Sequence, residues 1–358
     1  MDKKKYLYIS FLDLNAESGG GHIETLSEIR EFNKLFGEVD VFCIGKNLKI
    51  KNLKLQNKIT FCSTFFEFLP IFGKRPIVSL KLLKNYNGVI IADSRCFISF
   101  LISLFSRKNI FFKSHGSLAI YFCSYFISNF YLLKWQPIKS IFKTFYYLML
   151  IILFTVIELF IYVFSKNIFM MRSKVSFEAS FLGKLYCLFF SRKTKFSFCP
   201  SLTKFNINSS LNLSKNIKKE VNIISILIFG NWNLPHNFAS LIDFLTRLSC
   251  NKRCKINIVG QINNSNKKIL KKLNLKSFVN IYILGYINNL KELKRSSSHV
   301  ISCAKYGSGI PIKCLEIISE AEKYQYLPIS SIYCQKALAG LCENKFIIYP
   351  SQGPININ

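Results

Sequence analysis

The sequence has few acidic residues and no long basic tract, and each of these absences limits the kinds of partner that the protein could bind. Only 19 Asp and Glu residues accompany 49 Lys and Arg residues, which gives a formal net charge of +30. This imbalance favours an anionic partner, such as a phosphorylated substrate, an anionic membrane surface or nucleic acid. The positive charge is dispersed, however, and we find no run of five or more Lys/Arg residues and no nucleic-acid-binding motif. We therefore expect no nucleic-acid partner.

The 12 cysteines also lack a pattern, because no Cys-x-x-Cys pair and no Cys/His set has the spacing of zinc ligands. Several of them, such as Cys43, Cys123 and Cys314, lie in apolar runs, where a free thiol behaves as a small hydrophobic side chain. This usage suits a reducing cytoplasm. The first apolar run, Tyr6–Leu12, is too short for the core of a signal peptide and a cleavage site. We expect a cytoplasmic protein with no bound metal and no cofactor.

Apolar runs that are typical of buried parallel strands alternate with helical patterns along the 358 residues, which are enough for two domains. The 201–220 segment is rich in Asn, Ser and Lys, as linkers are. We predict an N-terminal domain over 1–200, a linker over 201–220 and a C-terminal domain over 221–358. The expected strands are Tyr6–Leu12, Val39–Gly45, Gly88–Ala92, Asn109–Lys113, Lys166–Met171, Phe196–Pro200, Asn222–Gly230, Ile256–Val259, Val279–Leu284, Val300–Cys303 and Phe346–Tyr349.

A glycine-rich turn joins a predicted strand to a predicted helix at 306–311. Glycine lets the backbone approach a phosphate, and a helix N-terminus offers free N–H groups and partial positive charge. Lys313 and Glu316 are three residues apart and share one helix face, so a cation could meet a diphosphate while a carboxylate accepts from sugar hydroxyls. The alternative is an ordinary strand-to-helix turn with a solvated Lys–Glu pair.

Two further positions fit a ligand crevice at the carboxyl ends of parallel strands. The glycines of 19–21 precede a helical pattern and would leave room for a phosphate or a sugar, although a tight turn explains them equally well. They are neither a Walker loop nor a dinucleotide-binding fingerprint. His115 follows the strand Asn109–Lys113 beside a glycine and would point into the crevice, unless it is a hydrogen-bonded structural histidine.

The order Gly-Ser-Gly-Ile-x-x-Lys-x-Leu-Glu over 307–316 resembles the nucleotide-sugar-binding segment of retaining, family 4-like glycosyltransferases with the GT-B fold. The resemblance implies an α/β protein with two Rossmann-like domains whose parallel sheets face each other across a cleft. It implies catalytic roles for His115 and Glu316. The donor-binding residues that it implies are Gly20, Gly21, Gly230, Asn237, Tyr286, Ser308, Gly309, Lys313 and Glu316.

The chain departs from the family pattern at three points. Ser308 stands where the family often has a second acidic residue, His236 stands where other branches have a basic residue, and the chain ends soon after Tyr349-Pro350. We therefore keep two hypotheses. The first is a retaining glycosyltransferase that moves a sugar from a nucleoside diphosphate sugar to a glycan or lipid-linked acceptor. The second is a catalytically inactive GT-B relative that acts as a scaffold in polysaccharide assembly.

The apolar segment Phe145–Phe164 is long enough to cross a membrane. A single span there would, however, leave strands of one predicted sheet on opposite sides of the bilayer. We therefore predict a long helix packed in the N-terminal domain, whose excess apolar surface rests on an anionic membrane; a span is the alternative. The expected location is the inner face of the cytoplasmic membrane, as a peripheral protein.

Overall fold

The computed structural model describes residues 5–10, 20–44, 59–62, 77–114, 117–134, 137–170, 195–198, 223–273, 278–305, 312–337 and 347–357. The chain divides into two compact units. Unit 1 comprises Met1–Ala119 and Ile152–Thr203, and unit 2 comprises Ile120–Ile151 and Lys204–Asn358. The predicted linker over 201–220 lies outside the described residues.

Unit 1 is built on a seven-stranded parallel sheet with the strand order β3-β2-β1-β4-β5-β6-β7. Its strands are β1 (Lys5–Ser10), β2 (Glu38–Ile44), β3 (Ile59–Cys62), β4 (Gly88–Ile91), β5 (Asn109–Ser114), β6 (Asn167–Met170) and β7 (Lys195–Phe198). Its helices are α1 (Gly20–Phe36), α2 (Leu80–Leu83), the 3-10 turn η1 (Ser94–Cys96) and α3 (Phe97–Phe105). Strand β3 was not predicted from the sequence.

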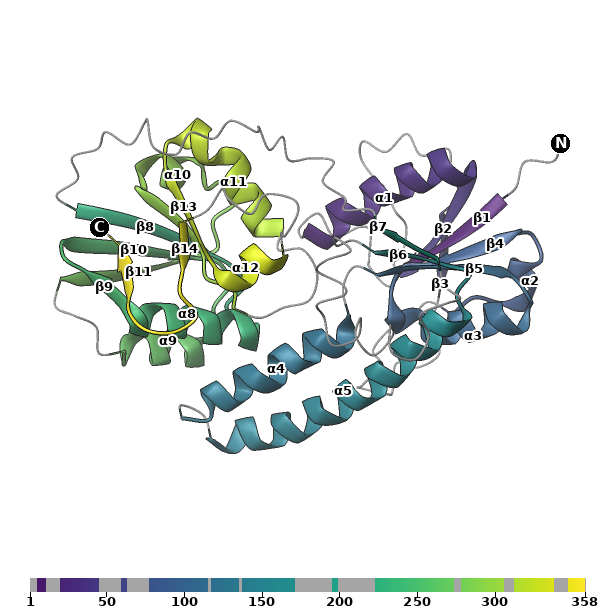
Figure 1. Ribbon diagram of the computed structural model, residues 1–358, viewed down its shortest axis with the longest axis horizontal. Helices are drawn as coiled ribbons and strands as arrows, with labels where there is room; N and C mark the ends of the chain where they lie inside the picture. Colours follow the sequence, from purple (N-terminus) through teal and green to yellow (C-terminus); the bar gives the residue numbers. More distant parts are fainter. Residues whose placement is uncertain are drawn as a thin grey trace. The chain divides into compact units, whose positions relative to one another are not determined.

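Successive side chains of a strand point to opposite sides of the sheet, so each strand contributes buried side chains to both faces. Tyr6 and Tyr8 of β1 face α1 and pack with Ile29 and Phe32 of that helix. Phe36, at the end of α1, lies 4.8 Å from the Tyr6 ring between centroids. Helix α1 covers one face of the sheet, and α2 and α3 lie on the other (Figure 1).

Unit 2 contains a six-stranded parallel sheet with the strand order β11-β10-β8-β12-β13-β14 and a small parallel pair, β15-β9. The strands are β8 (Ile223–Phe229), β9 (Leu248–Cys250), β10 (Arg253–Val259), β11 (Val279–Gly285), β12 (His299–Ser302), β13 (Leu327–Ser331), β14 (Ile347–Tyr349) and β15 (Ile355–Ile357). The helices are α8 (Pro235–Arg247), α9 (Asn264–Lys271), α10 (Lys291–Ser296), α11 (Ile312–Tyr324) and α12 (Ile332–Ala337).

Aliphatic side chains form the core of unit 2. Helices α8 and α9 cover one face of the sheet, and α10 and α11 cover the other (Figure 1). Phe238 and Leu241 of α8 pack on Ile226 and Ile228 of β8. Strands β9, β13 and β15 were not predicted from the sequence. The two sets of parallel strands, each with helices on both faces, confirm the predicted α/β class.

Helices α4 (Leu118–Leu132) and α5 (Pro137–Phe164) form an antiparallel hairpin that both units share (Figure 1). Tyr125 of α4 stacks on Tyr147 of α5 with ring centroids 5.2 Å apart. The later part of α5 packs in unit 1, where Tyr162 lies 5.8 Å from Phe112 of β5. The helix predicted over 145–164 is therefore real and begins eight residues earlier than expected.

Candidate functional site

The strand order of unit 2 fixes where a ligand site is expected. Strand β8 lies between β10 and β12, so the chain continues to one side of β8 through β10 and β11 and later to the other side through β12. Open parallel sheets bind ligands outside the carboxyl ends of their strands at such a switch point. Gly230 follows β8 there, and Lys313 lies in the first turn of α11, the helix after β12.

The strand ends around Gly230 are held together through backbone groups. Gly230 N donates to Val259 O at 3.0 Å, and Gly260 N donates to Gly285 O at 2.7 Å. Gly260 has φ +126°, and a Cβ on it would lie 1.7 Å from Gly230 O. Only glycine permits this approach of the two strand ends. The backbone of Gly230 and Gly260 therefore forms the floor of the site, and the Trp232 ring borders it.

The ammonium of Lys313 lies close to Gly230. A Cβ on Gly230 would be 3.1 Å from Lys313 Nζ and 3.0 Å from the Trp232 ring, so a side chain at Gly230 would crowd both. Lys313 Nζ makes no hydrogen bond or ion pair with any residue that the structure describes. Burial lowers the pKa of Lys313, while Cys303 and Glu316 oppose that shift. A cation placed this way is suited to an anionic ligand, because burial of an isolated charge is costly until a partner arrives.

The loop from Gly230 to α8 is braced by its own polar groups. Trp232 donates from its backbone to Gln261 O at 2.8 Å and from Nε1 to Val259 O at 2.9 Å. Asn237 Nδ2 donates to Asn231 O at 3.0 Å. Asn237, expected to bind the donor, thus closes the loop. Leu234 at the N-cap gives α8 no side-chain cap, so in the described part of the chain the first turn of this helix has no side-chain acceptor of its own.

The His236 ring is buried against α4. Its ring lies edge-on to Tyr121 and Tyr125 of α4, at 5.4 and 5.1 Å between centroids. Burial, with a contribution from Lys313, lowers the pKa of His236 to about 4. Its Nδ1 has no hydrogen-bond partner among the described residues. His236 therefore supplies no positive charge near Gly230, and Lys313 is a cation that the described residues do place there.

Glu316 lies one turn after Lys313 and is held by a buried lysine from another helix. Lys294 of α10 donates to Glu316 Oε1 at 2.7 Å and also pairs with Glu320. The Lys294 ammonium lies 5.2 Å from the centre of the Phe229 ring. Burial opposes its charge, but hydrogen bonds with the two carboxylates outweigh burial and raise the pKa of Lys294. Lys294 therefore keeps its positive charge, and Glu316 Oε2 has no partner among the described residues.

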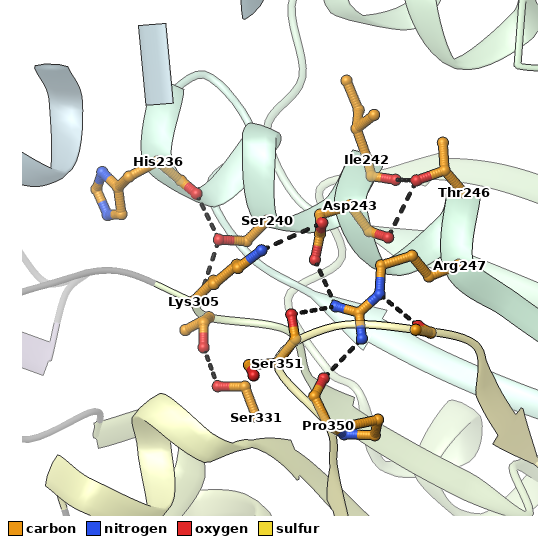
Figure 2. Close-up of polar contacts among 12 residues, drawn as sticks. His236, Ser240, Ile242, Asp243, Thr246, Arg247, Lys305, Ser331, Pro350 and Ser351 are labelled. Atoms are coloured by element: carbon orange, nitrogen blue, oxygen red, sulfur yellow. Dashed lines mark hydrogen bonds and ion pairs between the residues drawn. The ribbon is translucent and has the colours of Figure 1, made fainter. Parts of the chain in front are cut away.

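A second polar network holds Ala304 and Lys305, which come just before the 306–311 segment in the chain (Figure 2). Lys305 N donates to Ser240 Oγ at 3.1 Å, and Lys305 Nζ lies 3.3 Å from Asp243 Oδ1. Arg247 pairs with Asp243 Oδ2 at 3.0 Å and donates from Nη2 to Pro350 O at 2.6 Å. Ser331 Oγ donates to Ala304 O. Sequence reasoning missed this network, because its members lie far apart in the chain and have no motif.

The remaining residues that the sequence predicts for the site lie at the start of α1, just after β11, or outside the described residues. Gly20 and Gly21 are the first two residues of α1, and Tyr286 is exposed just after β11. His115, Ser308 and Gly309 lie outside the described residues. In the described part of the chain, no three His, Cys, Asp or Glu side chains are grouped so as to hold a metal ion.

In unit 1 a helix N-terminus is occupied by the protein's own carboxylate. Glu158 of α5 accepts from Ser117 Oγ and Leu118 N, both at 2.6 Å, where α4 begins, and from Ser94 Oγ at 3.1 Å. Burial raises the pKa of Glu158 to about 7, and the three hydrogen bonds oppose that rise. The α1 helix is tied to the sheet by the buried pair between Glu28 and Lys113 of β5.

Comparison with solved structures identifies the fold. HepE from Anabaena, whose structure contains UDP and glucose, is 14% identical over 98% of this chain and 86% of its own, with a TM-score of 0.53. WaaG, a glycosyltransferase involved in lipopolysaccharide biosynthesis, is 11% identical over 97% and 86%, with a TM-score of 0.50. Trehalose-6-phosphate synthase OtsA is 11% identical over 96% and 88%, with a TM-score of 0.50.

No protein-family profile matches the chain, and no curated protein matches it. The solved structures alone show that the chain has the fold of the GT-B glycosyltransferases, as its sequence predicted.

Proposed function

We propose that this chain is a retaining glycosyltransferase, which takes a sugar from a nucleoside diphosphate sugar and gives it to a glycan or lipid-linked acceptor. The observation that carries the proposal is the Lys313 ammonium, 3.1 Å from the position of a Cβ on Gly230 and without a partner among the described residues. When the bond from the anomeric carbon to the phosphate oxygen breaks, negative charge develops on the leaving diphosphate. A fixed cation and the N-terminal dipole of α11 would stabilise that charge.

Glu316 would hold the sugar or ribose end of the donor. Lys294 fixes one carboxylate oxygen at 2.7 Å, so the other can accept from a hydroxyl group without reorganisation of the side chain. Such a preorganised acceptor loses little conformational entropy when the donor binds. Tyr286, exposed after β11, would lie beside the nucleotide base.

Retention follows most simply from attack on the face that the diphosphate leaves. The acceptor hydroxyl oxygen forms the new bond to the anomeric carbon, and its proton passes to the departing phosphate oxygen. No protein nucleophile is needed for this step, and the role of His115 would be contact with the transferred sugar. The likeness in fold to HepE, whose structure contains UDP and glucose, and to WaaG supports a nucleotide-sugar donor.

The test is turnover with a panel of nucleoside diphosphate sugars, followed by nucleotide release and by mass spectrometry of the product. Lys313→Ala should lower kcat/KM by about 100-fold or more, because a preorganised charge at the leaving group is removed. Lys323→Ala is the matched control, since Lys323 lies in the last turn of the same helix. Equal turnover by wild type and Lys313→Ala would refute the role of Lys313.

Calorimetry separates transfer from the scaffold alternative. A glycosyltransferase binds at least one nucleotide sugar of the panel, and Lys313→Ala weakens that binding. A scaffold need bind none of them, so a wild-type chain that folds and shows no heat of binding with any donor would favour the inactive relative.

A further inference from the structure

The hairpin of α4 and α5 carries an exposed apolar face that the proposed sugar transfer does not use. Phe142, Phe145, Met149, Ile152 and Val156 are all more than half exposed, with Phe142 the most exposed at 75%. They recur at intervals of three and four residues and so form one stripe along α5, about 21 Å long at 1.5 Å per residue. Soluble proteins seldom expose so many large apolar side chains together without a partner.

The charges of the same hairpin have one sign. Between residues 117 and 164 the basic residues are Lys134, Lys139 and Lys143, all near the turn of the hairpin. The one acidic residue in this range is Glu158, which is 1% exposed and bonded to Ser117 and Leu118. The described part of the hairpin therefore presents exposed apolar and aromatic side chains together with Lys134 and Lys143, and no exposed carboxylate.

This combination matches the surface of an anionic bilayer. Apolar and aromatic side chains enter the boundary between headgroups and acyl chains, while lysines stay at the level of the anionic headgroups. A protein partner would be expected to need acidic counterparts within a defined interface, whereas a lipid surface supplies both negative charge and an apolar layer. We propose that the 117–164 hairpin docks on an anionic lipid surface with α5 lying flat, along the stripe defined above.

The helix docks without crossing the bilayer. Ile141–Phe164 is long and apolar enough to span, but a third of an apolar 18-residue window within it is buried inside the protein. Ile161 and Tyr162 belong to the core of unit 1, and Glu158 holds the start of α4. A span would remove these groups from their partners and place Glu158 in lipid, at a cost of about 2–3 kcal/mol for the carboxyl alone.

Vesicle binding by the full chain tests the proposal. We expect it to sediment with vesicles in which phosphatidylglycerol replaces part of the phosphatidylcholine, and much less with phosphatidylcholine alone. Phe145→Ser with Met149→Ser should lower vesicle partitioning about tenfold or more. Phe105→Ser, which changes an exposed phenylalanine of α3 at 80% exposure, is the control and should bind as wild type does. Lys143→Glu should weaken binding to the vesicles that contain phosphatidylglycerol and leave the weak binding to pure phosphatidylcholine vesicles unchanged.

The natural tryptophans supply a second readout. The sequence has two of them: Trp135, which stands between α4 and α5 in the chain, and Trp232, which is 2% exposed. A blue shift on addition of anionic vesicles would therefore report Trp135 entering the interface. Alkaline carbonate should release the protein from membranes, because a flat helix is peripheral.

Three results would overturn the docking. They are no vesicle binding by the wild type, unchanged binding by the Phe145/Met149 variant, and retention through a carbonate wash, which would indicate a span. A wild-type dimer that the same variant disperses, without lipid binding, would assign the stripe to a second copy of the chain. None of these outcomes depends on sugar transfer, so failure of the docking and failure of the proposed function can be told apart.

Discussion

The starts of two helices differ in what the protein places beside them. In unit 1, the Glu158 carboxylate fills the N-terminal turn of α4 and accepts from Ser117 and Leu118. In unit 2, the first turn of α11 carries the Lys313 ammonium, which makes no ion pair with any described carboxylate, although Glu316 lies one turn further along the helix. A helix start that a carboxyl group of the protein already fills leaves no place for an external anion. Where a cation and a glycine floor are left open, an anion from outside the protein is expected.

The largest loss of stability should come from separating the ends of β8 and β10, where Gly230 and Gly260 meet beside Lys313. Gly260→Ala combines φ +126° with a Cβ 1.7 Å from Gly230 O, so we expect a loss of stability of more than about 4 kcal/mol, or failure to fold. Gly285→Ala is the matched variant, because φ is +72° but no atom lies within 4 Å of the added Cβ. It should cost about 1–2 kcal/mol. Urea denaturation measures both, and equal costs would show that the close approach is not needed.

The pH dependence of stability tests the contact between Glu158 and the start of α4 in unit 1. The pKa of Glu158 is raised from 4.5 to about 7, so its protonated form stabilises the folded state fully below pH 4.5, and this stability is lost as pH rises to 7. The loss amounts to about 3 kcal/mol. Glu158→Gln keeps an acceptor for Leu118 and Ser94 and removes the titration. The difference in unfolding free energy between wild type and Glu158→Gln should therefore change between pH 5 and pH 8, whereas a constant difference contradicts burial of the carboxyl.

A smaller effect is expected from the network beside the open site. Arg247 donates to the carbonyls of Pro350, Ser351 and Gly353 and so ties the last strand, β15, to α8. Arg247→Ala should cost about 2 kcal/mol and speed the amide exchange of Ile355–Ile357. Arg253→Ala, at an exposed position of β10, is the control. Unchanged exchange in β15 would mean that pairing with β9 alone holds the segment.

Much of this architecture could be predicted because parallel strands are buried on both faces and appear as continuous apolar runs. All four residues of β4 are buried, for example. Strand β13 was missed because Pro328 lies within it, paired with Val300 of β12, and proline is rare inside a sheet. The three-residue strands β9 and β15 are too short for a periodic signal.

The site was predictable only where its residues are neighbours in the sequence. Lys313 and Glu316 could be found because they share one helical turn beside the glycine-rich segment. Lys294 could not, because its partner Glu316 is 22 residues away. Arg247 is 103 residues from Pro350, and no local sequence pattern predicts a hydrogen bond between residues so far apart in the chain. The hydrogen bonds of Glu158 likewise span 40 to 64 residues.

Hydrogen exchange with and without UDP tests the open site most directly. If the diphosphate binds beside Lys313, UDP should slow amide exchange at Gly230–Asn237 and at the start of α11, and Lys313→Ala should abolish that protection. The turn of α4 that Glu158 occupies should exchange at the same rate with and without UDP. Protection at α4 without any at Gly230–Asn237 or α11 would contradict the account.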